Sequence, residues 1–233
     1  MAVAAFIEPD WPVPPGVRAL VSTRAAGDFA AAAPLPPQLP GKPGWLRQVH
    51  GVHVADLDLR PEGEPEADAS VTRRRGTVCV VRTADCLPVL FAASDATAVA
   101  AAHAGWRGLA AGVLENTVSA LRARIAPGTE VTAWLGPAIG PARFEVGGEV
   151  REAFLARDAG CGAAFTAGAP GRWMCDLYVL ARRRLAAVGV GQVSGGGLCT
   201  YADEARFHSH RRDVQHRGLD ATGRMASFVW LVA

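Results

Sequence analysis

Three short apolar runs follow one another in the middle of the chain, and they restrict the fold more than any other feature. They are TVCVVRT, LPVLFAA and TAVAAAH, at residues 77–83, 87–93 and 97–103. Apolar runs of this length, bounded by polar residues, are typical of buried β-strands. The sequence therefore predicts three successive strands in this region.

Other elements are expected on both sides of these strands. The expected strands are residues 17–23, 44–50, 52–57, 130–136 and the tail 225–233, and the expected helices are 109–125, 147–156 and 175–188. Strands and helices are mixed without a regular alternation of one with the other. This pattern favours an α+β fold over a doubly wound parallel sheet.

The length of 233 residues suffices for one sizeable domain. The only stretch with the composition of a linker is 25–44, which is rich in Ala, Pro and Gly. Because only 24 residues precede it, a separate domain does not fit there. Residues 1–233 are therefore predicted to form a single domain, with 25–44 as a surface loop.

Charge and hydropathy exclude several classes of protein. The net charge is +2, and residues of both signs are interspersed, so the sequence does not indicate an extended positive surface that would bind a nucleic acid. No apolar run approaches the roughly 20 residues that cross a bilayer, and the N-terminus lacks the features of a signal peptide. The odd number of cysteines argues against a disulfide framework. We expect a cytoplasmic protein that binds neither nucleic acid nor membrane.

Three separate motifs place reactive side chains at the ends of expected strands. His50 ends the run RQVH, Cys86 lies between two apolar runs, and His103 ends the third run. Taken singly, a histidine at a strand end is commonly structural, and a cysteine between apolar strands is commonly a small buried apolar residue. Together the three lie where loops converge, and functional sites are built in such places.

One thiolate and two imidazoles are a ligand set that suits zinc, with a fourth position left for water or substrate. Copper is the alternative metal. Cys79 and Cys86 are seven positions apart, so a straight strand turns them to opposite faces and only one reaches the site. Asp85 is expected either to orient a ligand or move a proton, or to cap a turn.

A second polar cluster, RFHSHRRD, occupies residues 206–213. If 206–212 is extended, Phe207, Ser209 and Arg211 share one face. Arginine and serine in such a setting suit an anion, most simply phosphate, through forked hydrogen bonds. An exposed polar edge strand is the alternative interpretation.

The motifs QVHG, T-x-DC-x-P, HAGWRG, GPAIG, CT, F-x-S-x-RRD and TGR occur in this order. Together they resemble the YfiH-type laccase-domain family, whose members are also labelled polyphenol oxidoreductases and purine nucleoside phosphorylases. The resemblance covers residues 17–232. It implies a four-layer α/β/β/α sandwich with mixed sheets, shared with certain cysteine hydrolases, and a metal triad that matches His50, Cys86 and His103.

The resemblance also implies zinc-dependent phosphorolysis of adenosine, inosine, guanosine and methylthioadenosine, together with adenosine deamination. Purine nucleoside and phosphate are then the expected partners of a monomeric enzyme, with Cys86, His103 and Asp85 as catalytic residues. The expected phosphate-binding residues are Arg24, Arg107, Ser209 and Arg211. Family members usually carry an S-L-N-L-G-like segment and an N-R motif where this chain has its shortened 25–44 loop.

Three alternatives remain open at this point. A copper-dependent polyphenol oxidase is one, although six histidines are too few for several copper ions. A hydrolase with Cys86 as nucleophile and His103 as base is the second, for example an amidase that edits a cell-wall precursor. A partner-binding module without catalysis is the third.

Overall fold

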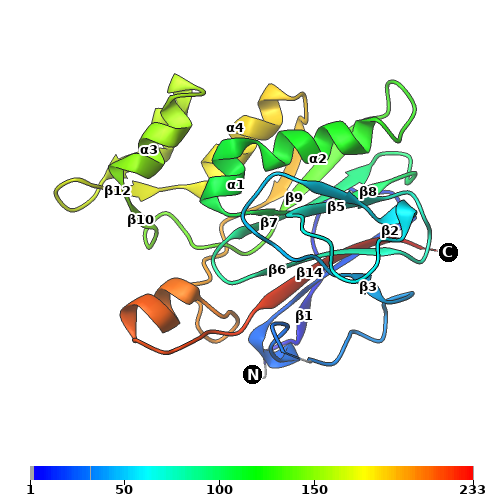
Figure 1. The fold of residues 1–233 in the computed structure, drawn as a ribbon, viewed down its shortest axis with the longest axis horizontal. Helices are drawn as coiled ribbons and strands as arrows, with labels where there is room; N and C mark the ends of the chain where they lie inside the picture. Colours follow the sequence, from blue (N-terminus) through cyan, green and yellow to red (C-terminus); the bar gives the residue numbers. More distant parts are fainter. Residues whose placement is uncertain (1–2, 32, 233) are drawn as a thin grey trace.

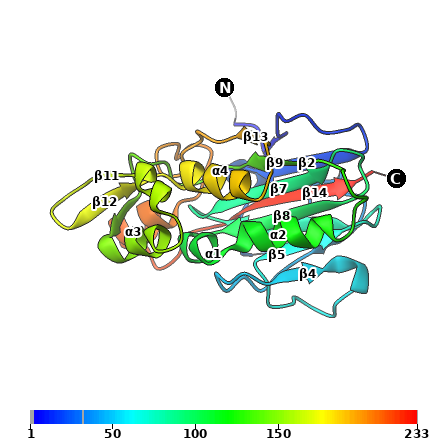
Figure 2. The same ribbon diagram turned by 90° about the horizontal axis from the view of Figure 1, so that it is seen from above.

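The computed structural model describes residues 3–31 and 33–232. Two large β-sheets lie face to face, and helices cover the outer face of one of them (Figure 1). Seen from above, the helices of residues 113–122 and 177–187 lie over that sheet, whereas the helix of residues 148–155 lies to one side of it (Figure 2). The helices are α1 (Trp106–Ala111), α2 (Val113–Arg122), α3 (Gly148–Leu155) and α4 (Leu177–Ala187).

The sheet beneath the helices has six strands in the order β13-β9-β7-β8-β5-β4. Their bounds are β4 (Val54–Asp56), β5 (Ala69–Thr72), β7 (Leu87–Ala93), β8 (Val99–Ala104), β9 (Val131–Leu135) and β13 (Gln192–Gly195). The central strand β7 is buried on both faces. Val89 and Phe91 pack toward the helices, and Leu90 and Ala92 pack toward the second sheet. This two-sided burial explains why the run is apolar throughout instead of alternating.

The second sheet has five strands in the order β1-β2-β14-β6-β3. Their bounds are β1 (Phe6–Ile7), β2 (Val17–Ser22), β3 (Pro43–Gly44), β6 (Val78–Thr83) and β14 (Met225–Leu231). Strand β14 lies between β2 and β6 and is antiparallel to both. The first and last parts of the chain are therefore joined in one sheet. The tail expected at 225–233 is this strand, and Ala233 lies outside the described residues.

A small third sheet lies beside α3, in the order β10-β12-β11. Its strands are β10 (Glu145–Gly147), β12 (Arg172–Cys175) and β11 (Phe165–Ala167). The predicted mixture of helices and mixed sheets in an α+β fold is confirmed, because β13 and β4 run parallel to their neighbours while most other pairs are antiparallel.

The outer face of the five-stranded sheet is covered by residues 24–31 and 33–45. Phe29 and Trp45 of this segment pack on Phe228 of β14, with ring centroids 5.7 and 6.1 Å apart. Within the described residues this segment holds one turn of 3₁₀ helix, Arg24–Ala26, and strand β3. The predicted loop is thus confirmed, whereas the predicted fourth layer of helix is not.

Two predicted elements are wrong. Residues 45–50 are not strand beyond Gly44, because the side-chain amide of Gln48 bonds both the N–H and the carbonyl of Arg82, at 2.8 Å each, in place of a backbone ladder. Residues 206–212 are not extended throughout. A π-helix begins at Arg211, whose backbone N–H donates to Asp85.

The single helix predicted over 109–125 is two helices. Gly112 has φ of 109°, a left-handed conformation that favours glycine, and it ends α1 and begins α2. The first of these helices also starts earlier than predicted, at Trp106. Strands β1, β5, β10, β11, β12 and β13 were not predicted. In the described part of the chain, no helix is long and apolar enough to cross a membrane.

Burial of β7 against the helices predicts a large loss of stability on truncation. Phe91→Ala removes a fully buried ring and should lower the free energy of unfolding by about 3–5 kcal/mol. Leu59→Ala, at a side chain that is 79% exposed, should change it by less than about 0.5 kcal/mol. Urea denaturation measures both, and equal midpoints for the two variants would contradict this packing.

Candidate metal centre

A cavity of about 550 Å³ opens beside the ends of β6 and β8, and it is lined by residues from widely separated parts of the chain. Along β6, Cys79 and Val81 face the space between the two large sheets, and Val99 and Ala101 do so along β8. The alternation of strand side chains turns Thr83 and His103 toward the same space, where both line the cavity. The cavity lies where the packing between the sheets ends.

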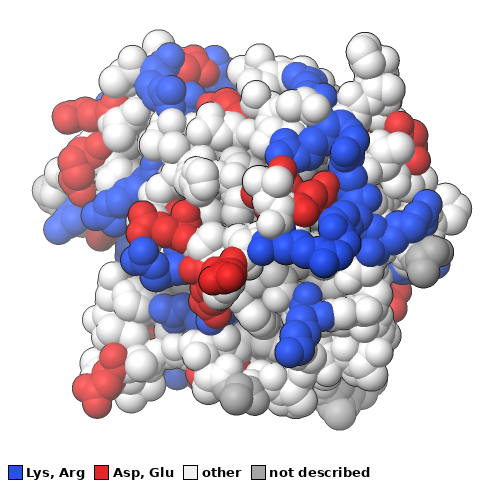
Figure 3. Space-filling view, turned by 45° about the vertical axis from the view of Figure 1, so that its right-hand side comes forward, with Lys and Arg blue, Asp and Glu red and all other residues white. Residues whose placement is uncertain are grey.

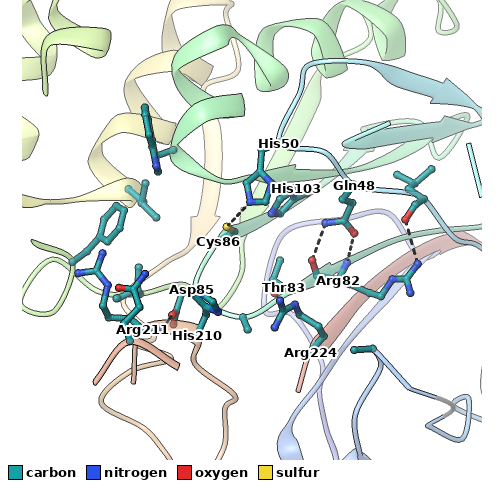
Figure 4. Close-up of a pocket in the computed structure, with 18 of the residues that line it drawn as sticks. Gln48, His50, Arg82, Thr83, Asp85, Cys86, His103, His210, Arg211 and Arg224 are labelled. Carbon is teal, nitrogen blue, oxygen red and sulfur yellow. Dashed lines mark hydrogen bonds between the residues drawn. The ribbon is translucent and has the colours of Figure 1, made fainter. Parts of the chain in front are cut away.

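His50, Cys86 and His103 meet in this cavity (Figure 4). Their ligating atoms all lie within 4.8 Å of one another, and the Cys86 Sγ is 3.8 Å from the His50 Nε2. Zinc ligands at bond lengths of about 2.3 Å for sulfur and 2.0–2.1 Å for nitrogen lie about 3.6 Å apart in a tetrahedron. The Cys86–His50 pair is close to this spacing, and the donor set of one thiolate and two imidazoles suits a zinc ion with one position left open.

One buried carboxylate positions two of these three residues. Asp68 accepts backbone N–H groups of Val49 at 3.1 Å, His50 at 2.9 Å and Gly51 at 2.7 Å. Its Oδ1 also contacts the Nδ1 of His103 at 2.8 Å, which leaves the Nε2 of that ring for a metal. Asp68 was not predicted as a functional residue, because it ends the polar loop before β5 and belongs to none of the motifs.

Two glycines of the HAGWRG motif allow close approach to the triad. A Cβ at Gly105 would lie 2.8 Å from the His50 ring and 3.0 Å from the Cys86 Sγ. A Cβ at Gly108 would lie 2.8 Å from the carbonyl oxygen of Gly51. Both positions exclude a side chain, so the start of α1 can pack directly against the triad.

The charges of the site favour a thiolate. Burial raises the pKa of the Cys86 thiol, but the neighbouring His103 and His50 rings outweigh it and lower that pKa to about 6. Burial lowers the pKa of His103, whereas Cys86 and Asp68 raise it to about 9. For Asp68, burial acts to raise the pKa, and the bonds from His103 and the backbone amides hold it below its usual value. The thiolate is the form that binds a metal or attacks a substrate.

Asp85 connects the Cys86 turn to the C-terminal segment. Its carboxylate accepts the hydroxyls of Thr200 at 2.6 Å and Ser209 at 3.0 Å, and the backbone N–H of Arg211 at 2.6 Å. Its φ of 88° is in the left-handed region, which turns the backbone sharply just before Cys86. Three donors thus occupy this carboxylate, which holds the two segments together.

The structure separates the predicted phosphate-binding residues. Only Arg211 lines the cavity. Ser209 is fully buried and its hydroxyl is used by Asp85, while Arg24 pairs with Glu204 and Arg107 lies over the Trp106 ring. Arg224, from the TGR motif, lines the cavity and was given no role in the sequence analysis.

Residues 30–232 match the family model described as multi-copper polyphenol oxidoreductase laccase. The chain belongs to this family. Among its relatives is "Purine nucleoside phosphorylase YfiH" of Escherichia coli, 49% identical over 256 residues that cover 97% of this chain and 99% of the relative. A purine nucleoside phosphorylase of Pseudomonas aeruginosa is also 49% identical, over 97% of this chain and 98% of its own. The resemblance to the YfiH-type family is confirmed.

Solved structures of similar proteins share the fold. A protein of Neisseria meningitidis is 40% identical with a TM-score of 0.87, and the match covers 99% of this chain and 100% of that one. YlmD of Geobacillus stearothermophilus is 25% identical with a TM-score of 0.81, covering 100% and 98%. The YfiH-type fold therefore extends over the whole described chain.

Asp68→Asn should weaken zinc binding about 10–100-fold, because partners that orient metal ligands have effects of this size. Two hydrogen bonds reach each oxygen of Asp68, and the substitution replaces one of the two acceptor oxygens by a donor. Competition with a chromogenic chelator measures the affinity. Asp58→Asn is the matched control, since Asp58 also accepts bonds from Thr72 and Arg73 but lies outside the cavity lining. An equal loss in both variants would refute this role of Asp68.

The low pKa of Cys86 predicts that, in chelator-treated protein, this thiol is alkylated at lower pH than an ordinary thiol. Only the thiolate reacts with iodoacetamide, so the rate at Cys86 should rise with pH through a midpoint near 6. His103→Ala removes a positive neighbour and should move the midpoint upward. Peptide mapping by mass spectrometry separates Cys86 from the other thiols. The Cys86→Ser variant, which lacks this thiol, is the control for alkylation elsewhere. A midpoint near that of an ordinary thiol in the unsubstituted protein would contradict the arrangement.

Proposed function

We propose that this protein is a zinc-dependent purine nucleoside phosphorylase that acts on adenosine, inosine, guanosine and methylthioadenosine and also deaminates adenosine. One observation carries the proposal: the His-Cys-His group and the guanidinium of Arg211 line the same cavity. The anion-binding group can hold phosphate for the cleavage of a nucleoside, and the metal site beside it can supply Lewis-acid chemistry to the same substrate. The names of the relatives from Escherichia coli and Pseudomonas aeruginosa support the phosphorylase part.

His50, Cys86 and His103 would hold the zinc ion. When bound, zinc supplies Lewis-acid chemistry, which polarises an oxygen of the substrate or lowers the pKa of a nearby water for deamination. The Asp68 contact fixes which nitrogen of His103 is available. Copper is the alternative metal, since imidazoles bind both ions, but the thiolate with two imidazoles and one open position favours zinc.

Arg211 would hold the attacking phosphate. Its Nη1 donates to the carbonyl of Glu145 at 2.8 Å, and its guanidinium lies 5.4 Å from the Phe144 ring centroid. Among the described residues, no carboxylate forms an ion pair with it. Asp85 fixes its backbone. A guanidinium held in this way presents its remaining N–H groups to an anion as a fork.

Phosphorolysis then requires little more than placement of the two substrates. A phosphate oxygen bonds to C1′ of the ribose while the bond from C1′ to the purine N9 breaks, and the leaving purine takes up a proton. Trp106, Phe144 and Leu177 offer apolar surface in the cavity for the purine ring. Asp85 would contribute by holding the Cys86 turn and Arg211 in register.

A cysteine hydrolase is the second candidate, and the pKa of about 6 for Cys86 beside two imidazoles favours it. The thiolate would attack an amide carbonyl, such as that of a cell-wall precursor, and form an acyl-enzyme as the C–N bond breaks and the amine leaves with a proton from His103. A bound zinc ion would occupy the same sulfur. The two functions are therefore exclusive on one site, and metal content separates them.

We expect the purified protein to hold about one zinc ion per chain and to release adenine from adenosine only when phosphate is present, with phosphate-independent formation of inosine. Cys86→Ala should lose the zinc and at least about 100-fold in turnover, because it removes a ligand. Cys161→Ala, at a buried thiol outside the cavity lining, is the control. Metal analysis and chromatography of the products measure these outcomes.

Wild-type turnover in a metal-free Cys86→Ala variant would refute the proposal. Zinc-free wild-type protein that forms a stable acyl-enzyme with an amide substrate would favour the hydrolase.

A further inference from the structure

His210 lines the cavity, but neither the metal triad nor the phosphate-binding guanidinium uses it. Its side chain is exposed, and within residues 3–31 and 33–232 it forms no hydrogen bond or ion pair. Asp85 holds the backbone on both sides of it, because its carboxylate accepts the hydroxyl of Ser209 and the backbone N–H of Arg211. An imidazole ring without a protein partner is thus attached to a well-held part of the cavity wall.

The proposed reaction needs a proton donor at the purine. When the bond from C1′ to N9 breaks, its electron pair stays on the purine, which leaves far more readily if its ring accepts a proton at N7. Proton transfer from a positioned side chain contributes about 10²–10⁴-fold to the rate of such a step. Histidine takes this role most often, because an imidazole ring titrates near neutral pH.

The other titratable side chains of the lining have different tasks. The two histidines and the cysteine of the triad are the expected metal ligands. The Asp85 carboxylate accepts three donors, and the Glu64 carboxylate is paired with Arg82 at 2.6 Å, so both act as acceptors. Guanidinium groups do not release protons. Among the described residues of the lining, His210 therefore remains as the titratable proton donor.

His210 is also the chain neighbour of the proposed phosphate ligand. It has helical backbone angles and directly precedes the π-helix that begins at Arg211. Consecutive side chains of a helix do not face each other. The guanidinium of Arg211 extends to the Phe144 ring, and Figure 4 shows His210 beside Asp85. A nucleoside attacked by a phosphate at Arg211 therefore lies in the part of the cavity that His210 lines.

We propose that His210 is the general acid that protonates the leaving purine at N7. This inference rests on the proposed function, because it assigns the proton that phosphorolysis requires. The imidazolium gives one ring proton to N7 while the C1′–N9 bond breaks and a phosphate oxygen bonds to C1′. The products are the neutral purine and ribose 1-phosphate. Because the ring is exposed, it then takes a new proton from the solvent.

The test uses two nucleosides that differ in their need for this proton. Guanosine must gain it to leave, whereas 7-methylguanosine in weakly acidic solution already carries a positive charge on its ring and leaves without it. In zinc-loaded protein at saturating phosphate, His210→Gln should lower kcat/KM for guanosine by about 10²–10⁴-fold. The same variant should leave kcat/KM for 7-methylguanosine nearly unchanged. Chromatography of the released bases measures both.

His53→Gln is the matched control, since His53 is another exposed histidine and lies outside the cavity lining. It should change neither rate. The His210 side chain bonds no other described residue, so its variants should fold. A zinc content equal to that of the unsubstituted protein shows that the metal site is intact in them.

A further control concerns phosphate bound elsewhere on the protein. Basic side chains gather with carboxylates among them on the face shown in Figure 3, and a shallow depression outside the main cavity is lined by Arg73, Arg74, Arg75 and Arg124 together with Asp58 and Asp95. These arginines could attract the phosphate of the assay. Arg74→Met, outside the cavity lining, should leave both rates and the KM for phosphate unchanged.

Equal losses for guanosine and 7-methylguanosine in His210→Gln overturn the inference, because a residue that binds phosphate or supports the fold affects both. Unchanged cleavage of guanosine also overturns it and leaves the proposed function intact. If the unsubstituted protein cleaves guanosine but not 7-methylguanosine, added imidazole should restore cleavage of guanosine to His210→Ala, and no such rescue overturns the inference. When zinc-loaded unsubstituted protein cleaves neither nucleoside with phosphate, the proposed function itself is contradicted, and the inference with it.

Discussion

The carboxylate of Asp68 is fully buried, and it accepts three backbone N–H groups and a ring nitrogen in place of water. A buried carboxylate without hydrogen-bond partners would destabilise the fold. The bonds that Asp68 needs therefore also fix the loop that carries His50 and the ring of His103. The positive φ of 61° at His50 follows from this geometry, because its own amide and both neighbouring amides turn toward one acceptor. The candidate metal triad therefore depends on a residue that is not itself a ligand.

Asp85 performs a comparable role at the turn before Cys86. It joins the turn before Cys86 to residues more than a hundred positions later, and the helix that begins at Arg211 starts on its carboxylate. The two carboxylates thus fix different parts of the site, Asp68 the His50 loop and the His103 ring, and Asp85 the Cys86 turn and the backbone of Arg211. The packing between the two large sheets ends at this place, and the cavity that remains is lined by both charged and apolar side chains.

Much of the fold could be predicted because strands such as β7 and β8 are buried on both faces and their apolar runs are continuous. The strand predicted at 44–50 failed because a side-chain amide, that of Gln48, replaces the backbone ladder. Ser209 fits a phosphate-binding pattern by residue type, but its hydroxyl is already bonded to Asp85. Local spacing contains no information about such contacts, which join residues far apart in sequence.

The sequence by itself determined the long apolar strands in the middle of the chain and the positions of the main helices, since periodicity and turn residues act over a few positions. It also placed His50, Cys86 and His103 next to such runs. Only the tertiary structure decided that these three side chains meet, that Asp68 holds two of them, and that Arg211 and Arg224 enter the same cavity while Arg24 and Arg107 do not. The physical reason is that each of these outcomes depends on the pairing of a buried polar group with a distant partner. Such pairing is settled when the sheets pack and water is removed.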